Sequence, residues 1–481
     1  MREVAVGRLA EVLGAVRVGD PGTAVGPDVV IDSRAATPGC LFVALHGERA
    51  DGHDFAAAAV DAGAAALLVE RALDLPVPQL LVGDTLAALA VLGRAVAAEA
   101  SAAGMVTIGI TGSSGKTSTK DLLAQVLATA GETVAPVGSF NNEIGVPLTA
   151  TRVTPSTRFL VSEMGARGQG HIAWLCSVVP PSVGVVVNVG HAHLGEFGSV
   201  EAIAQAKGEL VEAVPAGGWA VLNDDDPLVT AMRARTPARL AAFSTAGEPG
   251  WGDLRVWASD IGADALQRPS FVLHAAPSTE SGTAPGPVHP DASAPVQLQV
   301  SGAHQVGNAL AAAAVALSQG LTVAAVAAAL SHAEARSHWR MELVERPDGL
   351  LVVNDAYNAN PDSMAAALRT LASLRRPGGR LLAVLGDMLE LGEGAPDAHR
   401  EIGVLCADLG IDAVIALGHH ATDLAAGYGQ ATMLVPNRQV AAAAASAWLR
   451  PTDVVLVKAS RGLGLETVAE DLSVTPEGGR P

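Results

Sequence analysis

The sharpest chemical signal in the sequence is the segment GITGSSGKTS at residues 109–118. It follows a predicted strand at 105–110 and opens a predicted helix whose apolar residues keep helical spacing. Glycines let backbone N–H groups turn inward around an anion, and the N-terminus of the helix adds positive charge. Lys116 would reach the outer phosphates of a nucleotide, and Thr117 would offer its hydroxyl to Mg²⁺. The segment therefore predicts an ATP site made of Gly112, Ser113, Ser114, Gly115, Lys116, Thr117 and Ser118.

The glycine spacing of this segment departs from the strict P-loop pattern G-x-x-x-x-G-K-[ST]. That pattern requires glycine at position 110, where the sequence has Ile110, and the glycines fall instead at positions 109, 112 and 115. The competing interpretation is a chance glycine-rich turn. Because strand, glycines, Lys-Thr pair and helix are all in register, the phosphate loop is favoured.

A nucleoside triphosphatase also needs ligands for magnesium. Glu163 ends the apolar run at 159–161, where a carboxylate at the end of a strand would face the crevice of a parallel sheet. Position alone does not distinguish this role from that of a solvated glutamate. His193 in NVGHAHL is a further candidate, and spacing alone does not choose between it and His191.

The elements that would position these residues alternate between strands and helices in three blocks, which predicts an α/β protein with parallel or mixed sheets. Strands are expected at 29–31, 41–45, 66–69, 80–82, 105–110, 159–162, 183–189, 350–354, 380–385, 413–417 and 453–458. Helices are expected at 53–62 and 86–103, with alanine-rich helices over about 309–333. Residues 275–295 contain five prolines and predict a flexible loop between two hairpin arms at 271–274 and 296–300.

Composition limits the class of protein. The 481 residues suggest about three domains. The net charge of 31 − 49 = −18 argues against a nucleic-acid coat or a protein that binds anionic membranes. We expect neither a membrane span, because we recognise no sufficiently long apolar run, nor a signal peptide. Three widely spaced cysteines exclude a disulfide framework and fit a reduced, cytoplasmic enzyme.

Several stretches taken together resemble the Mur ligase family, the ATP-dependent amide-forming enzymes of peptidoglycan precursor synthesis. Besides the phosphate loop, the stretches are DSRAATPGCLFVALHGERADGHDF, SFNNEIGVPLT, EMGARGQGHI, AHLGEFGS, AKGEL, NDAYNANPDSM, LGDMLELG and VKASRG, in that order. The resemblance implies an N-terminal UDP-substrate domain at 1–103, a central P-loop ATPase domain at 104–334 and a Rossmann-like C-terminal domain at 335–481.

The resemblance is greatest to the family member that joins D-alanyl-D-alanine to UDP-N-acetylmuramoyl-tripeptide. It implies these two small-molecule substrates, ATP and two Mg²⁺ ions, and an acyl-phosphate intermediate. We expect a monomer with no nucleic-acid partner. The alternatives are the ligase that adds the third residue to the dipeptide precursor, and a non-catalytic nucleotide-binding scaffold. The first lacks support because its Asp-Asn-Pro-Arg signature is absent, and the second because Lys116, Glu163 and Lys207 are all present.

The resemblance also assigns roles to single residues. It implies that Glu163 and His193 bind magnesium together with Thr117, and this selects His193 over His191. It also implies that Lys207 is carbamylated and that the carbamate bridges or orients the magnesium. From sequence alone, Lys207 would be a solvated helix lysine. The implied nucleotide contacts are His304, Asn308, Arg340, Asp355, Tyr357 and Asn358. The implied substrate contacts are Ser33, Arg34, Asn141, Asn142, Lys458 and Arg461.

Two departures from the family's pattern concern the segment at 275–295 and the substrate pocket. Residues 275–295 are longer and richer in proline than is usual, and we assign them no role. Residues 457–462 read VKASRG where a second serine is expected, which affects the details of the dipeptide pocket.

Overall fold

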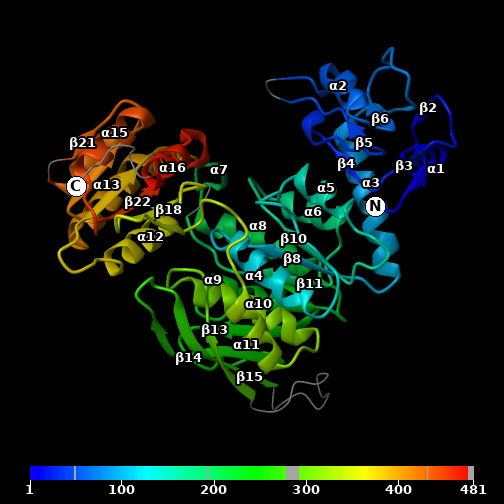
Figure 1. The fold of residues 1–481 in the computed structure, drawn as a ribbon. Coiled ribbons are helices and arrows are strands. Elements are labelled where there is room, and N and C mark those ends of the chain that lie inside the picture. The colour runs from blue at the N-terminus through cyan, green and yellow to red at the C-terminus, as the bar shows by residue number, and fades with distance from the viewer. Residues whose placement is uncertain (48–49, 192–193, 278–291, 431, 475–481) are drawn as a thin grey trace.

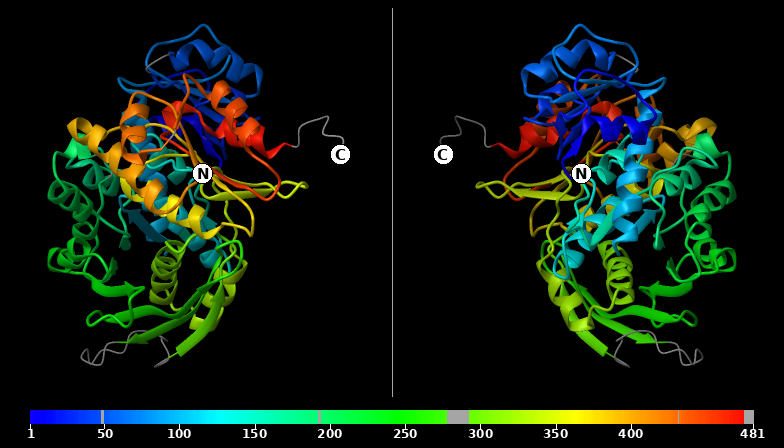
Figure 2. Two further views of the ribbon diagram at one scale, coloured as in Figure 1. Left: turned by 90° about the vertical axis from the view of Figure 1, so that its left-hand side faces the viewer. Right: turned by 90° about the vertical axis from the view of Figure 1, so that its right-hand side faces the viewer.

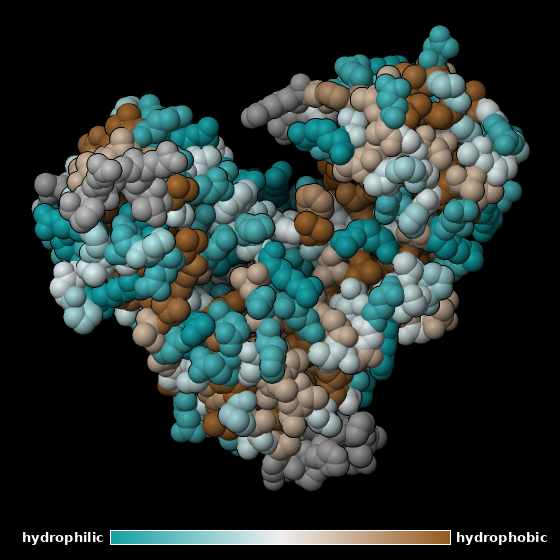
Figure 3. All heavy atoms as spheres, viewed as in Figure 1, coloured by the Kyte–Doolittle hydropathy of each residue, from teal (hydrophilic) through white to brown (hydrophobic). Residues whose placement is uncertain are grey.

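The computed structural model describes residues 1–47, 50–191, 194–277, 292–430 and 432–474. It contains three sheet-centred units in chain order (Figure 1). The first and third units stand apart above the central one, and a hollow lies between them (Figure 3). In the side views of Figure 2, the antiparallel strands of the central unit lie at the end of the molecule away from the other two units.

The first unit is built on a five-stranded sheet in the order β2-β7-β6-β5-β4, beside a β1-β3 pair. Its elements are β1 (Val4–Ala5), α1 (Val6–Leu13), β2 (Val16–Val18), β3 (Ala24–Val25), β4 (Val29–Val30), η1 (Ser33–Ala35), β5 (Leu41–Val43), η2 (Gly52–Phe55), α2 (Ala56–Asp61), β6 (Ala66–Val69), β7 (Gln79–Leu81) and α3 (Thr85–Ala102). The expected helix at 53–62 is thus divided, because its first turn is a 3₁₀ turn capped by Asp51.

Helix α3 connects the first unit to the central one. The side chain of Asp84 caps it by accepting a hydrogen bond from the backbone N–H of Ala87 (2.9 Å). By length and composition it is apolar enough to cross a membrane, in contrast to our expectation that no run of residues would be. Its buried residues pack into two cores, Leu89 and Leu92 into that of the first unit and Ala97 and Ala100 into one formed with the central unit, so its apolar residues have packing partners within the protein.

The central unit holds a nine-stranded mixed sheet in the order β16-β15-β14-β13-β12-β11-β8-β10-β9. Its strands are β8 (Val106–Thr111), β9 (Thr133–Val134), β10 (Phe159–Glu163), β11 (Val183–Val186), β12 (Trp219–Asn223), β13 (Arg239–Ser244), β14 (Leu254–Ala263), β15 (Pro269–Pro277) and β16 (Ala292–Gln297). Its helices are α4 (Lys116–Ala128), α5 (Gly145–Ala150), α6 (His171–Val178), α7 (Leu194–Phe197), α8 (Val200–Glu212), α9 (Pro227–Ala231), η3 (Met232–Arg235), α10 (Gln305–Ser318) and α11 (Val323–His332).

The expected hairpin is present, with β15 and β16 paired antiparallel. Both strands extend into the segment predicted to be a loop, because Ala275 pairs with Ala292 and Val272 pairs with Pro295. The prediction of a loop over all of 275–295 was therefore wrong at both ends. Residues 278–291 lie outside the described part of the chain.

The third unit has a six-stranded sheet in the order β17-β18-β22-β19-β20-β21, parallel except for β17. Its elements are β17 (Glu342–Glu345), β18 (Leu351–Asn354), α12 (Pro361–Ser373), β19 (Leu381–Leu385), η4 (Gly392–Gly394), α13 (Ala395–Asp408), β20 (Ala413–Ala416), α14 (Ala421–Tyr428), β21 (Met433–Leu434), α15 (Arg438–Trp448), β22 (Val454–Lys458), η5 (Arg461–Leu463) and α16 (Glu466–Ser473). Alternate residues of its strands enter separate cores on the two faces, such as Val353 on one face and Val352 on the other.

Candidate active site

The phosphate loop forms the floor of the site. Strand β8 ends at Thr111 and helix α4 begins at Lys116, so the intervening backbone turns through the glycines. Gly115 caps the helix with a φ of 78°, and a Cβ there would lie 2.4 Å from Asn308 Oδ1. Only glycine fits both the left-handed backbone and this close approach. The N–H of Ser114 donates to Asn188 Oδ1 (2.9 Å), which fixes the loop against the segment after β11.

Lys116 lies at the first turn of α4, and its Nζ donates to the carbonyl of Gly112 at 2.5 Å. Burial lowers the pKa of this ammonium, the carboxylate of Glu163 opposes that shift, and Arg340 adds to it. Lys116 and Arg340 thus place two cations near each other. Arg340 Nε is buried without a hydrogen-bond partner among the described residues. An orphaned guanidinium N–H beside a glycine loop suits the phosphate oxygens of a nucleotide.

Glu163 is the last residue of β10, next to β8, and is 1% exposed. One of its carboxylate oxygens accepts from Thr117 Oγ1 and the other from Asn141 Nδ2, each at 2.8 Å. A carboxylate and a hydroxyl at the end of a phosphate loop form an oxygen donor set that fits Mg²⁺. His193, the third predicted ligand, lies outside the described residues. Its competitor His191 faces the third unit, where its ring Nδ1 lies 3.4 Å from Asp362 Oδ1.

Lys207 lies on α8 and is 3% exposed, which excludes the solvated helix lysine that its sequence context suggests. Burial, and then the charge of Lys116, lower the pKa of Lys207 to about 7. No described residue forms an ion pair or a hydrogen bond with its amine. A neutral amine that faces a cation is suited to react with CO₂, because the resulting carbamate would be an anion beside Lys116.

The third unit supplies a buried ion pair opposite the phosphate loop. Lys458, the last residue of β22, is 2% exposed, and its Nζ donates to Asp355 Oδ2 at 2.6 Å and to the carbonyl of Asn358 at 2.9 Å. Asp355 follows β18, and its other oxygen accepts the N–H of Met341 at 3.0 Å. The pair therefore links the ends of two parallel strands to the segment that enters this unit.

Two arginines stack on aromatic rings at the junction of the central and third units. The guanidinium of Arg340 lies 4.1 Å from the ring centre of Tyr357, and that of Arg461 lies 4.2 Å from the ring centre of Trp339. The hydroxyl of Tyr357 contacts the hydroxyl of Ser139 in the central unit. Trp339 has a φ of 61°, a backbone conformation that is strained for a bulky side chain.

Helix α10 brings two further predicted residues to the same place. Asn308 is buried and donates from Nδ2 to Gln305 Oε1 at 2.9 Å. His304 immediately precedes the helix, and burial lowers its pKa. Its imidazole is therefore biased towards the neutral form, which can both donate and accept hydrogen bonds.

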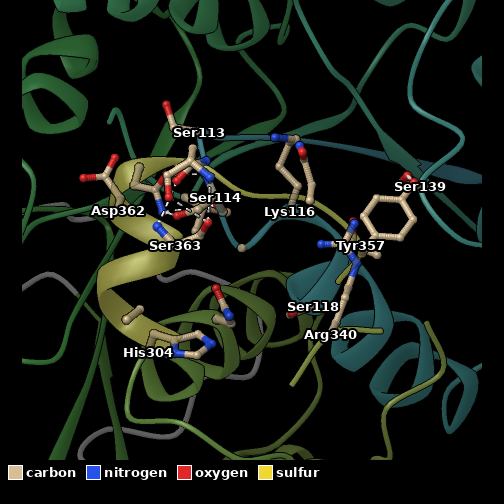
Figure 4. A pocket seen from close by; sticks show the side chains of 18 of the residues that line it. Ser113, Ser114, Lys116, Ser118, Ser139, His304, Arg340, Tyr357, Asp362 and Ser363 are labelled. Carbon is tan, nitrogen blue, oxygen red and sulfur yellow. Dashed lines mark hydrogen bonds between the residues drawn. The ribbon is translucent and has the colours of Figure 1, made fainter. Parts of the chain in front are cut away.

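These elements enclose one cavity of about 840 Å³ between the central and third units (Figure 4). Most of the predicted residues line it: Ser113, Ser114, Gly115, Lys116, Thr117, Ser118, Asn141, Asn142, Glu163, Lys207, His304, Asn308, Arg340, Asp355, Tyr357, Asn358, Lys458 and Arg461. Gly112 lies in the loop beneath the cavity without lining it. Ser33 and Arg34 belong to the first unit, where the exposed Arg34 is paired with Asp32 at 2.6 Å.

The cavity also contains residues that sequence reasoning missed. Ser139 and Asp362 both connect the central and third units: Asp362 Oδ2 accepts the N–H of His191 at 2.9 Å, and Ser139 contacts Tyr357. Figure 4 shows Asp362 beside Ser113 and Ser114 of the phosphate loop. Both residues fall within stretches that carried the family resemblance, which was the available signal. The other lining residues that were not predicted include Arg167, His171, Asn188, Asp225, Ser363 and Glu390.

Comparison with known sequences gives a consistent result along the chain. Three domain models match: the Mur ligase family catalytic domain at residues 28–111, the Mur ligase middle domain at 110–316 and the Mur ligase glutamate ligase domain at 339–461. The UDP-N-acetylmuramoyl-tripeptide--D-alanyl-D-alanine ligase of Mycobacterium tuberculosis is 48% identical, with 98% of each chain covered. The enzyme of that name from Escherichia coli is 38% identical, with 92% of this chain and 93% of the other covered.

Solved structures resemble the fold over nearly its whole length. MurF from Acinetobacter baumannii superposes with a TM-score of 0.83 at 30% identity, covering 98% of this chain and 99% of that one. MurF ligase from Thermotoga maritima, solved in complex with ADP, gives a TM-score of 0.74 at 29% identity, covering 93% of this chain and 97% of that one.

Proposed function

The chain belongs to the Mur ligase family, and from this premise we propose how its cavity joins D-alanyl-D-alanine to UDP-N-acetylmuramoyl-tripeptide with ATP. The reaction is an ATP-dependent amide-bond formation in peptidoglycan precursor synthesis. The observation that carries the proposal is the single cavity in which Lys116 and Glu163 of the central unit face Asp355 and Lys458 of the third. Such a cavity can hold a nucleotide and a carboxylate substrate between two units that close on each other.

ATP would bind with its phosphates over the loop at 112–118. The loop amides, Lys116 and Arg340 would neutralise the β- and γ-phosphates. Binding of ATP by this chain is supported by the relative that was solved with ADP. His304, Asn308, Asp355, Tyr357 and Asn358 are the further nucleotide contacts that we propose.

One magnesium ion would be held by Thr117 and Glu163, with His193 as a third ligand. The carbamate of Lys207 would be a ligand of a second ion. When bound, Mg²⁺ neutralises charge on the transferring phosphoryl group. Asn141 would hold Glu163 in the orientation this requires, since it already donates to one carboxylate oxygen at 2.8 Å. Carbamylation of Lys207 is supported by its burial and by its pKa of about 7.

The tripeptide's terminal carboxylate is a poor electrophile until it is phosphorylated. A carboxylate oxygen attacks the γ-phosphorus of ATP, ADP leaves, and an acyl phosphate forms. The free amine of D-alanyl-D-alanine then attacks the acyl carbon, loses a proton and displaces phosphate. The protein's contribution is positioning, charge neutralisation and exclusion of water from the acyl phosphate.

The substrate sites lie at both ends of this arrangement. We assign the UDP end of the substrate to Ser33 and Arg34 in a domain at 1–103, and the peptide end to Asn141, Asn142, Lys458 and Arg461. The ATPase domain would span 104–334 and the closing Rossmann-like domain 335–481. The proposal includes a monomer acting in the cytoplasm, where ATP is available.

A matrix assay tests the substrate assignment directly. Each UDP-muramoyl-peptide is incubated with ATP, Mg²⁺ and either single amino acids or D-alanyl-D-alanine, and phosphate release is measured. We expect release only with the tripeptide and D-alanyl-D-alanine together. Release with the dipeptide and a single amino acid would identify the preceding ligase of the series instead. ATP turnover that requires neither peptide substrate would contradict a ligase.

A further inference from the structure

The sequence contains only four lysines, and three of them, Lys116, Lys207 and Lys458, line the cavity. The fourth, Lys120, does not line it, yet it is 2% exposed and lies one turn beyond Lys116 on α4. Burying an ammonium costs free energy unless the charge is paired and its protons are hydrogen-bonded. The partners of Lys120 therefore indicate what this residue does.

Lys120 Nζ lies 2.7 Å from Asp121 Oδ1 and donates to the backbone carbonyls of Pro136 (3.0 Å) and Gly138 (2.7 Å). Ser337 Oγ lies farther away, at 3.4 Å. These contacts use all three protons of the ammonium. They join helix α4 to two segments that are distant in sequence. The first contains Pro136 and Gly138, and the second contains Ser337.

The first segment leads directly to the proposed metal site. One residue past Gly138, Ser139 contacts the hydroxyl of Tyr357 in the third unit. Two residues further on, Asn141 donates to Glu163 Oε1 at 2.8 Å. Gly138 has a φ of 59°, so its carbonyl is presented to Lys120 from a turn that only glycine adopts readily.

The second segment leads to Arg340. The N–H of Ser337 donates to Asp121 Oδ2 at 3.0 Å, so Asp121 bonds Lys120 with one oxygen and this segment with the other. One helical turn on, Gln125 Oε1 accepts the N–H of Glu334 at 3.1 Å. Arg340 follows three residues after Ser337, at the junction with the third unit.

We propose that Lys120 and Asp121 are a positioning pair that fixes Asn141 and Arg340 relative to the phosphate loop. The inference rests on the proposed function, because it concerns the alignment of the metal and phosphate contacts in that reaction. Stability of the fold does not itself require the charges, since apolar side chains of similar volume often replace a buried ion pair at no cost. The pair instead ties both segments to the helix that carries Lys116.

The test compares Lys120→Met with the double variant Lys120→Met/Asp121→Leu, which leaves no unpaired buried carboxylate. If the pair positions the site, both variants lower kcat by about 100-fold, the scale expected for misplacement of reacting groups by about 1 Å. The Mg²⁺ concentration for half-maximal activity rises because Asn141 no longer holds Glu163. KM for the UDP-substrate stays unchanged, and Lys120→Arg recovers part of kcat. Thermal unfolding of each variant reports the folded fraction.

Arg158→Met is the matched control, because Arg158 also binds a loop carbonyl of the central unit, that of Ala130 at 2.6 Å, but does not line the cavity. It should leave kcat and the Mg²⁺ requirement unchanged. A double variant that keeps wild-type kcat and Mg²⁺ dependence per folded molecule overturns the inference. Mg²⁺-dependent ADP binding, measured by calorimetry, tests the pair without turnover. If Mg²⁺ increases the affinity for ADP less in the variants than in the wild-type protein, the positioning role of Lys120 and Asp121 is supported. This outcome would stand even if the ligase assignment fails in the matrix assay.

Discussion

Removal of CO₂ should inactivate the enzyme through Lys207. The lysine nitrogen attacks the carbon of CO₂, an N–C bond forms and one proton is released, so only the neutral amine reacts. With a pKa of about 7, instead of the model-peptide value of 10.5, about 90% of the amine is neutral at pH 8, against about 0.3% for an ordinary lysine. The environment of Lys207 thus raises the reactive fraction about 300-fold at this pH.

The sign of the pH dependence follows from the direction of this shift. Because burial lowers the pKa of Lys207, the neutral amine accumulates as pH rises through about 7 and is lost as pH falls below it. At a fixed concentration of dissolved CO₂, the reactive fraction falls about tenfold between pH 8 and pH 6. Protonation of the amine there would place an ammonium beside Lys116 in a buried site, which is unfavourable.

The assay is phosphate release by enzyme that has been stripped of CO₂ at pH 6, returned to pH 8 and supplied with stepped bicarbonate. Activity should return with bicarbonate, and ¹³C-bicarbonate should give one carbamate resonance that is absent from Lys207→Ala. Acetate should restore part of the activity of Lys207→Ala by replacing the missing anion. Full activity without CO₂, no carbamate resonance and no rescue by acetate would together refute the reasoning.

Three further predictions address the phosphate loop, the reaction path and the buried ion pair. Lys116→Ala should lower kcat by at least about 100-fold with an unchanged thermal transition, because the lysine would no longer neutralise the phosphates. Near-normal phosphate release by the folded variant would contradict the loop assignment. With ¹⁸O in the tripeptide's terminal carboxylate, mass spectrometry should find one labelled atom in phosphate and ADP as the nucleotide product, whereas label in AMP would indicate adenylation. Lys458→Met should cost about 3 kcal/mol of unfolding free energy in urea, because it leaves the carboxylate of Asp355, whose side chain is only 14% exposed, without its cation. Lys458→Met/Asp355→Asn should recover most of this loss, and equal stability of the two variants would show that the pair carries no such penalty.

Local features of the site were predictable from sequence because they depend on neighbours in the chain. The register of the phosphate loop follows from glycines next to Lys116 at the junction of a strand and a helix. The strands that end near Glu163 and Lys458 were recognisable from their apolar runs. Within one sheet, parallel strands place their carboxyl ends at the same edge, so Glu163 lies beside the phosphate loop in the central unit and Lys458 lies beside Asp355 in the third.

Contacts between segments distant in sequence were not predictable from these patterns. Nothing local indicates that Ser139 meets Tyr357, or that Lys120 is buried, because both depend on how the loops fold over α4. Strands β12 and β13 were not anticipated, although both are buried along most of their length. The solvated state that sequence context suggests for Lys207 was wrong because a helix position does not reveal which face the tertiary packing covers.

The scarcity of lysine gives the molecule an unusual chemical selectivity. Since Lys116, Lys207 and Lys458 line the cavity and Lys120 is buried, amine-directed acylating reagents find no lysine on the outer surface. The α-amine of Met1 is itself hydrogen-bonded to the carbonyl of Pro27 at 2.9 Å. Acylation counted by mass spectrometry would therefore report occupancy of the cavity, whereas cross-linking of neighbouring molecules would need reagents that target carboxylates.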